Sequence, residues 1–189
     1  MKYIEVEIRI FLDDDSVFFN WLNCNSQYIG QSSQKDVYYQ PIENKFIFKN
    51  NIGENDADKW LRIRTYKGIT EVCYKHWHRD PKTNESLYAD EVETIVSDED
   101  AIRKMFVLLG YEEISTTDKT RDSWIYGNFK IERDVVKGLG KFYEIEFHGE
   151  IDDPEKGRGL IFDFLQEINI AGWKLIDRGY PWMQWNNNW

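Results

Sequence analysis

The sequence is poor in cysteine and proline and contains no long hydrophobic run. Its 189 residues include two cysteines and four prolines. Two cysteines are too few for a disulfide scaffold or a cysteine-based zinc site, and they favour a reducing, cytoplasmic location. No stretch approaches the roughly 18 consecutive apolar residues of a membrane helix. The N-terminal Met1-Lys2-Tyr3-Ile4-Glu5 carries charges where a signal peptide would be apolar. We therefore expect no association with a membrane.

Basic residues are also in the minority, with 24 Lys and Arg against 34 Asp and Glu and a net charge of −10. This balance excludes general binding to a nucleic-acid duplex, but it permits a phosphate ligand in one concave site. The aromatic content of 16% excludes a disordered chain. The length predicts a single domain over 1–189. Its strands are expected over about 1–148, and a C-terminal helix and Trp-rich tail over about 152–189.

Apolar and charged side chains alternate along most of the predicted strands, as expected for strands with one buried face. In the first strand the apolar series is Ile4, Val6, Ile8 and Ile10, and the opposite series is Glu5, Glu7 and Arg9. Short turns such as Lys67-Gly68 and Gly127-Asn128 predict antiparallel hairpins. The segment 26–35 is polar and is expected to be a loop. The pattern predicts seven or eight strands and three helices, which is an α+β fold with a barrel-like sheet.

Charges of one sign recur two residues apart on the predicted strands, and so lie on one face. These pairs are Arg62 with Arg64, Glu91 with Glu93, Lys119 with Arg121, Glu132 with Asp134, and Glu144 with Glu146. A solvated face explains any one pair, but neighbouring like charges repel, so their recurrence predicts compensating partners. Carboxylates suit hard divalent cations, and arginines suit phosphate oxygens. A closed sheet with these faces inside would form a tunnel suited to a linear triphosphate and one or two metal ions.

The motif Glu5-Val6-Glu7-Ile8-Arg9 resembles the ExExK signature of the CYTH superfamily, also called triphosphate tunnel metalloenzymes. The series that follows in the chain is similar to that family as well. It consists of Leu61-Arg62-Ile63-Arg64, Lys75, Glu91-Val92-Glu93, Lys119-Thr120-Arg121, Asp134 and Glu144-Ile145-Glu146. The resemblance covers about residues 1–147. The segment from Asp134 through Glu146 is most similar to the subgroup that contains class IV adenylyl cyclases.

This resemblance implies a closed antiparallel eight-stranded β-barrel with flanking helices, and activity on small triphosphate compounds with Mg²⁺ or Mn²⁺. The metal ligands it implies are Glu5, Glu7, Asp134, Glu144, Glu146 and one of Glu91 and Glu93. The phosphate-binding residues it implies are Arg9, Arg62, Arg64, Lys75, Lys119 and Arg121. Arg9 and Lys75 are the expected catalytic members of that set. Arg9 departs from the lysine of the signature, because it keeps the charge but not the compact ammonium group.

The sequence leaves the activity open between an adenylyl cyclase and a phosphohydrolase of tripolyphosphate, thiamine triphosphate or nucleoside triphosphates. The alternatives to an enzyme are a non-catalytic barrel that binds a nucleotide or polyphosphate, and a structural barrel with a solvated charged face. Barrels of this size often form homodimers, although nothing in the sequence marks an interface. Cys73 lies in phase with Lys75, and we expect it to be a passive thiol.

Overall fold

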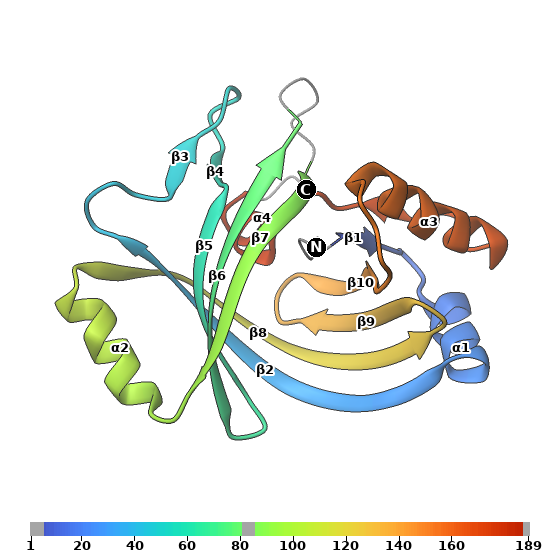
Figure 1. Cartoon of the computed structure of the whole chain (residues 1–189), viewed down its shortest axis with the longest axis horizontal. Coiled ribbons are helices and arrows are strands. Elements are labelled where there is room, and N and C mark those ends of the chain that lie inside the picture. Colours follow the sequence, from blue (N-terminus) through green and yellow to red (C-terminus); the bar gives the residue numbers. More distant parts are fainter. Residues whose placement is uncertain (1–5, 81–85, 187–189) are drawn as a thin grey trace. The chain divides into compact units, whose positions relative to one another are not determined.

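The structure is a computed structural model and describes residues 6–80 and 86–186 (Figure 1). The strands are β1 (Val6–Phe11), β2 (Gln27–Pro41), β3 (Ile47–Lys49), β4 (Asn55–Ala57), β5 (Lys59–Tyr66), β6 (Ile69–Arg79), β7 (Ser86–Val96), β8 (Tyr111–Tyr126), β9 (Phe129–Val136), β10 (Gly140–Phe147) and β11 (Lys174–Leu175). The helices are α1 (Ser16–Asn25), α2 (Glu99–Leu108), α3 (Pro154–Glu167) and α4 (Tyr180–Trp185). None of the described helices is long and apolar enough to cross a membrane.

Nine of the strands form one sheet in the hydrogen-bonded order β11-β1-β10-β9-β8-β2-β5-β6-β7, and β3 pairs with β4. The antiparallel α+β character is confirmed, since β1 with β10, β10 with β9, β2 with β5 and β5 with β6 are all antiparallel. The prediction of a closed eight-stranded barrel is wrong. In the pairings of the described residues, β11 and β7 stand at the two ends of the order. The second edge of β1 is taken by β11, where Ile10 lies opposite Leu175.

Local sequence signals place several elements correctly, but the described residues form eleven strands and four helices where seven or eight strands and three helices were expected. Lys67 and Gly68 both have positive φ, 49° and 76°, as a two-residue hairpin turn requires. Asp98 caps α2 by accepting a hydrogen bond from the Ala101 N–H at 2.9 Å. The segment 26–35 is not a loop, because β2 begins at Gln27. Its Ser and Gln side chains suit a strand exposed to water along most of this stretch, which an apolar alternation cannot reveal.

The chain divides into two compact units, and each is built from three separate segments. The first unit consists of residues 1–32, 78–89 and 120–177, and the second unit of residues 33–77, 90–119 and 178–189. Strands β2, β6, β7 and β8 contribute residues to both units, so the sequence offers no linker at the division.

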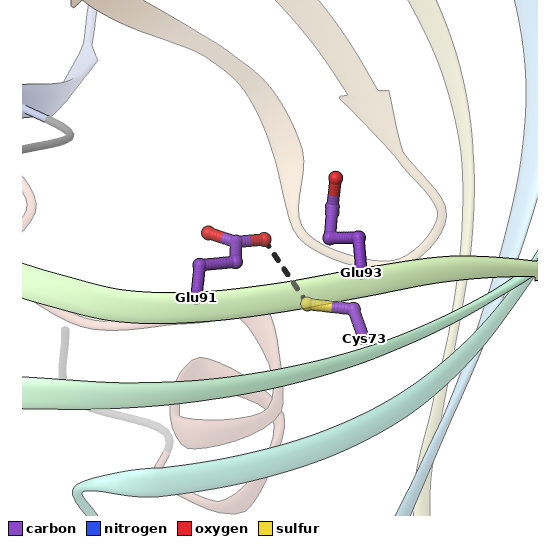
Figure 2. Close-up of side chains that lie close together, drawn as sticks. All are labelled: Cys73, Glu91 and Glu93. Atoms are coloured by element: carbon purple, nitrogen blue, oxygen red, sulfur yellow. Dashed lines mark hydrogen bonds between the residues drawn. The ribbon is translucent and has the colours of Figure 1, made fainter. Parts of the chain in front are cut away.

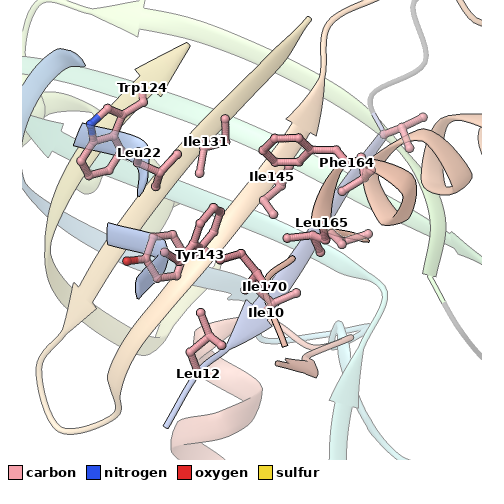
Figure 3. Packing of buried hydrophobic residues seen from close by; sticks show 14 residues of the cluster. Ile10, Leu12, Leu22, Trp124, Ile131, Tyr143, Ile145, Phe164, Leu165 and Ile170 are labelled. Atoms are coloured by element: carbon pink, nitrogen blue, oxygen red, sulfur yellow. The ribbon is translucent and has the colours of Figure 1, made fainter. Parts of the chain in front are cut away.

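The first unit buries the apolar face of β1, β9 and β10 against α1 and α3 (Figure 3). Its core includes Ile10 and Ile145 from the strands, Leu22 from α1 and Leu165 from α3, all fully buried. Successive strand residues point to opposite faces. The charged residues between these apolar positions are therefore directed away from the core, on the other face of the same strands.

The second unit has a smaller core on one face of β2 and β5. Val37 and Ile63 pack there with Phe106 of α2. The alternation along these strands leaves Asp36, Tyr38, Arg62 and Arg64 on the opposite face. Each unit thus pairs an apolar face covered by helices with a face that carries charged side chains.

Candidate functional site

The charged face of the first unit is assembled by the registers of β1, β9 and β10. Arg9 lies opposite Glu144, and Glu7 lies opposite Glu146. On the other side of β10, Glu144 lies opposite Glu132. Directly opposed residues place their Cβ atoms about 4.5–5.5 Å apart. The register therefore brings carboxylates from three strands together.

Arg121 on β8 connects these strands through a single guanidinium group. Its Nε lies 2.6 Å from Oδ1 of Asp134, and its Nη2 lies 2.6 Å from Oδ2 of the same carboxylate. The guanidinium also contacts Glu132 and Glu144. Burial by itself would lower the pKa of Arg121, but Asp134, Glu144 and Glu132 raise it well above its ordinary value. Arg121 is therefore a permanent cation shared by three carboxylates.

Two further basic side chains, Arg9 and Lys130, contact carboxylates of the same face. Arg9 Nε donates to Glu144 Oε1 at 3.1 Å. Lys130 Nζ lies 3.1 Å from Glu132 Oε1 and 3.8 Å from Glu146 Oε2. Burial lowers the pKa of Lys130, but Glu132 and Glu146 more than compensate, so the pKa is raised overall. Arg121 and Lys130 are thus protonated at neutral pH, and Arg9 carries the permanent charge of an arginine.

The carboxylates of this face outnumber its bases. We use the name acidic cluster for Glu7, Glu132, Asp134, Glu144 and Glu146. Its five carboxylates face the cations Arg9, Arg121 and Lys130, and His148 Nε2 lies 2.9 Å from Glu146 Oε2, so that carboxylates outnumber basic side chains within this set. Oxygen-only donors with this excess match the preference of hard divalent cations such as Mg²⁺ and Mn²⁺. The donor set therefore fits the metal that the sequence implies.

The charged face of the second unit centres on the pair formed by Asp36 and Arg64. Arg64 Nε lies 2.7 Å from Oδ1 of Asp36, and Arg64 Nη2 lies 2.8 Å from Oδ2. Asp36 is 0% exposed. Burial raises the pKa of this carboxyl, but the neighbouring cations Arg64, Arg62 and Lys119 together lower it more, so that the pKa lies well below its usual range. Asp36 is therefore ionised and fixes the orientation of Arg64.

Arg62, two residues earlier on β5, lies beside acidic residues of β6 and β7. Its Nη2 lies 3.1 Å from Glu71 Oε1 and 3.5 Å from Glu93 Oε1. Its Nε is buried and has no hydrogen-bond partner among the described residues. A buried N–H donor without a partner is costly. Arg62 therefore retains a donor that an anionic ligand could satisfy.

Cys73 on β6 lies beside Glu91 and Glu93 of β7 (Figure 2), and Lys75, two residues later on β6, contacts Glu91. Lys75 Nζ lies 3.0 Å from Glu91 Oε2, and the Cys73 thiol donates to Glu91 Oε1 at 3.0 Å. Burial and the neighbouring Glu91 together raise the pKa of Glu93 to about 7. Burial also raises the pKa of the Cys73 thiol, which is therefore protonated at neutral pH.

The site residues predicted from the sequence are divided between the two units. The first unit contains Glu7, Arg9, Arg121, Asp134, Glu144 and Glu146, and the second unit contains Arg62, Arg64, Lys75, Glu91, Glu93 and Lys119. Glu5 lies outside the described residues. Both Glu91 and Glu93 lie beside basic groups, so this geometry does not choose between them. Within the second unit, the Lys119 ammonium also lies 5.1 Å from the centre of the Tyr180 ring.

Four charged residues of these faces were not among the predicted site residues. They are Asp36, Glu71, Lys130 and Glu132. The sequence did contain a signal for Glu132, because this residue lies on the same face of its strand as Asp134, two residues later. Asp36 and Glu71 become significant only through the register that places each of them opposite Arg64. Lys130 is likewise identified by its position opposite Glu146.

Comparison with known proteins gives a family match and similar structures. The model of the CYTH domain family matches residues 3–180. A Methanocaldococcus jannaschii protein named "Putative adenylate cyclase MJ0240" is 28% identical over 180 residues, covering 94% of this chain and 96% of that protein. The solved structure of PH1819 from Pyrococcus horikoshii is 26% identical with a TM-score of 0.73, covering 95% of this chain and 97% of that chain. HpAC1 from Hippeastrum, described as having a dominant triphosphatase activity, is 19% identical with a TM-score of 0.61, covering 93% and 91%.

Proposed function

Because the chain belongs to the CYTH domain family, we propose that it is a divalent-metal-dependent enzyme acting on small triphosphate compounds. The observation that carries this proposal is the acidic cluster, in which five carboxylates gather on one charged face and outnumber the four basic side chains named with it. A protein that only bound polyphosphate would need cations, and surplus carboxylates would repel its ligand. Surplus carboxylates are useful where a divalent cation bridges protein and phosphate.

We propose that Mg²⁺ or Mn²⁺ is held by the acidic cluster, with Glu5, which precedes the described residues, as a further ligand. When bound, such a cation neutralises phosphate charge and lowers the pKa of a bound water. Arg121 contacts three members of the cluster, so it fixes their positions before any cation arrives. Preorganised ligands of this kind lower the cost of binding.

We assign phosphate binding to Arg9, Arg62, Arg64, Lys75, Lys119 and Arg121. Phosphoryl transfer depends on positioning and on stabilising the charge that spreads over the phosphate oxygens. Arg64 is held by Asp36, and Arg62 has a buried Nε available for an oxygen acceptor. We propose Arg9 and Lys75 as the catalytic members of this set. Their partners Glu144 and Glu91 orient them.

We propose phosphohydrolysis as the reaction: water attacks the terminal phosphorus, the bond to the bridging oxygen breaks with the diphosphate part as the leaving group, and the terminal group is released as orthophosphate. This reaction requires only that the triphosphate be bound and its charge stabilised, and arginine and lysine side chains are suited to both tasks. It does not require a dedicated site for the organic part of the substrate. Inorganic tripolyphosphate, thiamine triphosphate and nucleoside triphosphates are the candidate substrates.

The second candidate is adenylyl cyclase activity. In that reaction the ribose 3′-hydroxyl attacks the α-phosphorus, and pyrophosphate leaves with the formation of cyclic AMP. The supporting observation is the 28% identity to the Methanocaldococcus jannaschii protein over nearly the whole of both chains. The same bases would serve both reactions, which differ in the attacking oxygen and in the phosphorus attacked.

Product analysis with Mg²⁺ or Mn²⁺ tests the proposal and separates the two reactions. ATP, thiamine triphosphate and inorganic tripolyphosphate are supplied in parallel, to wild type and to Glu144→Gln. The matched control is Glu167→Gln, which changes an exposed glutamate of α3. Orthophosphate without cyclic AMP identifies a hydrolase, and cyclic AMP with pyrophosphate identifies a cyclase. If no substrate is turned over, and triphosphate still binds, the proposal is wrong and the non-catalytic binding barrel replaces it.

A further inference from the structure

The second unit contains a group of metal-ligating side chains that includes sulfur. Cys73 of β6 and Glu91 and Glu93 of β7 each present one ligand atom, and the three atoms lie within 4.8 Å of one another (Figure 2). The acidic cluster of the first unit contains only oxygen donors. The two groups therefore differ in the class of metal that they suit.

We propose that Cys73, Glu91 and Glu93 form a site for a borderline or soft divalent cation, of which Zn²⁺ is the representative, and that this site selects against Mg²⁺. Sulfur ligands favour such cations, whereas Mg²⁺ takes oxygen. Three protein ligands leave the fourth position of a tetrahedral ion to water. The proposal departs from the expectation that one of Glu91 and Glu93 holds Mg²⁺ or Mn²⁺, and its tests do not involve turnover.

The distances require only small side-chain movements. Zinc bonds of about 2.3 Å to sulfur and about 2.1 Å to oxygen, at tetrahedral angles, place the donor atoms about 3.4–3.6 Å apart. The Cys73 Sγ already lies 3.0 Å from Glu91 Oε1. A cation would replace the proton that the thiol now donates to that oxygen, and the proton would pass to solvent. Glu93 is half-exposed, so its side chain is able to move toward the sulfur.

Each carboxylate of this group is also anchored by a base, as ligands in metal sites commonly are. Lys75 Nζ contacts Glu91 through Oε2, whereas the thiol contacts Oε1 of the same carboxylate. Arg62 Nη2 lies 3.5 Å from Glu93 Oε1. The two bases also offset the charge of a thiolate with two carboxylates. They leave one net negative charge for the cation to neutralise.

The position of the site predicts a structural effect of the cation. Cys73 belongs to β6, and both glutamates belong to β7, which stands at the end of the strand order. An ion bound by all three side chains would link the terminal strand to its neighbour. We therefore expect binding of Zn²⁺ to raise the Tm.

Absorption spectroscopy with Co²⁺ tests the donor set directly, because a bound thiolate gives a charge-transfer band in the near ultraviolet. The experiment uses the full chain, freed of metal, as wild type, Cys73→Ser and Cys24→Ser. Cys24 is the exposed cysteine of α1 and provides the matched control. We expect the band in wild type and Cys24→Ser, its absence in Cys73→Ser, and at least about tenfold weaker binding in Glu93→Gln. An excess of Mg²⁺ should leave the band unchanged.

Thermal unfolding with Zn²⁺ provides the second measurement. At about 100 times its Kd for this site, Zn²⁺ should raise the Tm of wild type and Cys24→Ser by roughly 5 °C more than that of Cys73→Ser, in which the acidic cluster is still able to bind the cation. The proposal is overturned if wild type gives no thiolate band, if the band depends on Cys24, or if Mg²⁺ displaces Co²⁺ readily. Because no readout involves turnover, failure here would not affect the proposed triphosphate chemistry.

Discussion

Arg121 and Asp134 form a bidentate ion pair, in which each of two guanidinium nitrogens lies 2.6 Å from a different carboxylate oxygen. Asp134 is 0% exposed, and Arg121 is also buried. The same guanidinium contacts Glu132 and Glu144. A single cation therefore holds three carboxylates together without a metal.

The first prediction is that Arg121→Gln destabilises the metal-free protein by about 3–5 kcal/mol, because it leaves buried carboxylates without their shared counter-ion. Urea unfolding measures this loss. Adding Mg²⁺ should restore part of the stability, since a cation then replaces the missing charge. The control is Lys45→Gln, which breaks the exposed pair with Glu112 and should cost less than about 1 kcal/mol. Equal losses in the two variants would contradict the role assigned to Arg121.

The second prediction concerns pH and the pair formed by Asp36 and Arg64. The pKa of Asp36 lies well below its usual range, because Arg64, Arg62 and Lys119 together outweigh the effect of burial. The ionised carboxylate therefore stabilises the fold fully above the unfolded-state pKa of about 4, and this contribution is lost as the pH falls below that value. Asp36→Asn should cost about 3 kcal/mol or more at pH 7. Urea unfolding of the variant and wild type should show this difference shrinking toward pH 2, and a difference independent of pH would refute the assignment.

The alternation of side chains was sufficient to predict which face of each strand carries charge, but not which charges meet. The charged series of β1, containing Glu7 and Arg9, and the pair Glu144 and Glu146 of β10 were visible in the sequence. Their pairing depends on a register between strands more than 130 residues apart. The family resemblance supplied the chain order of these motifs and is confirmed by the CYTH match. It did not identify Glu132, whose role depends on Arg121 reaching from β8.

The open strand order was the least accessible feature from the sequence. Strand β11 has two residues, Lys174 and Leu175, which is too short for any alternation to be recognised. Its pairing with β1 is a tertiary contact that follows the placement of α3. The polar first part of β2 was missed for a related reason, since its residues have no apolar face. Hydrophobic periodicity detects buried faces, and it carries no information where both faces are wet.

The third prediction is that Glu93→Gln stabilises the metal-free protein at alkaline pH. Burial and Glu91 raise the pKa of Glu93 to about 7. Wild type therefore loses stability as the pH rises from about 4.5 through 7, because the folded state disfavours ionisation. The gain from the glutamine should be about 1 kcal/mol at pH 8, since Glu93 is half-exposed and solvent screens it.

Urea unfolding in EDTA at pH 4, 6 and 8 measures this effect of Glu93→Gln. Wild type and variant should be equally stable at pH 4 and diverge as the pH rises. The matched control is Glu54→Gln in the loop before β4, where no comparable divergence is expected. A variant that is less stable than wild type at pH 8 would show that ionised Glu93 contributes favourably, contrary to this prediction.

The fourth prediction is that Lys75→Gln lowers kcat/KM for the best triphosphate substrate by about 100-fold, the usual cost of removing one charged donor from a reacting group. Lys75 Nζ is held by Glu91 at 3.0 Å and lies 4.6 Å from the centre of the Trp77 ring, so its position is fixed before substrate binds. Lys104→Gln, on the exposed surface of α2, should leave kcat/KM unchanged. Lys75→Arg should recover part of the loss, because it restores the charge with a different shape. A loss in kcat/KM that follows only a lower Tm, with no recovery in Lys75→Arg, would show that Lys75 supports the fold rather than the reaction.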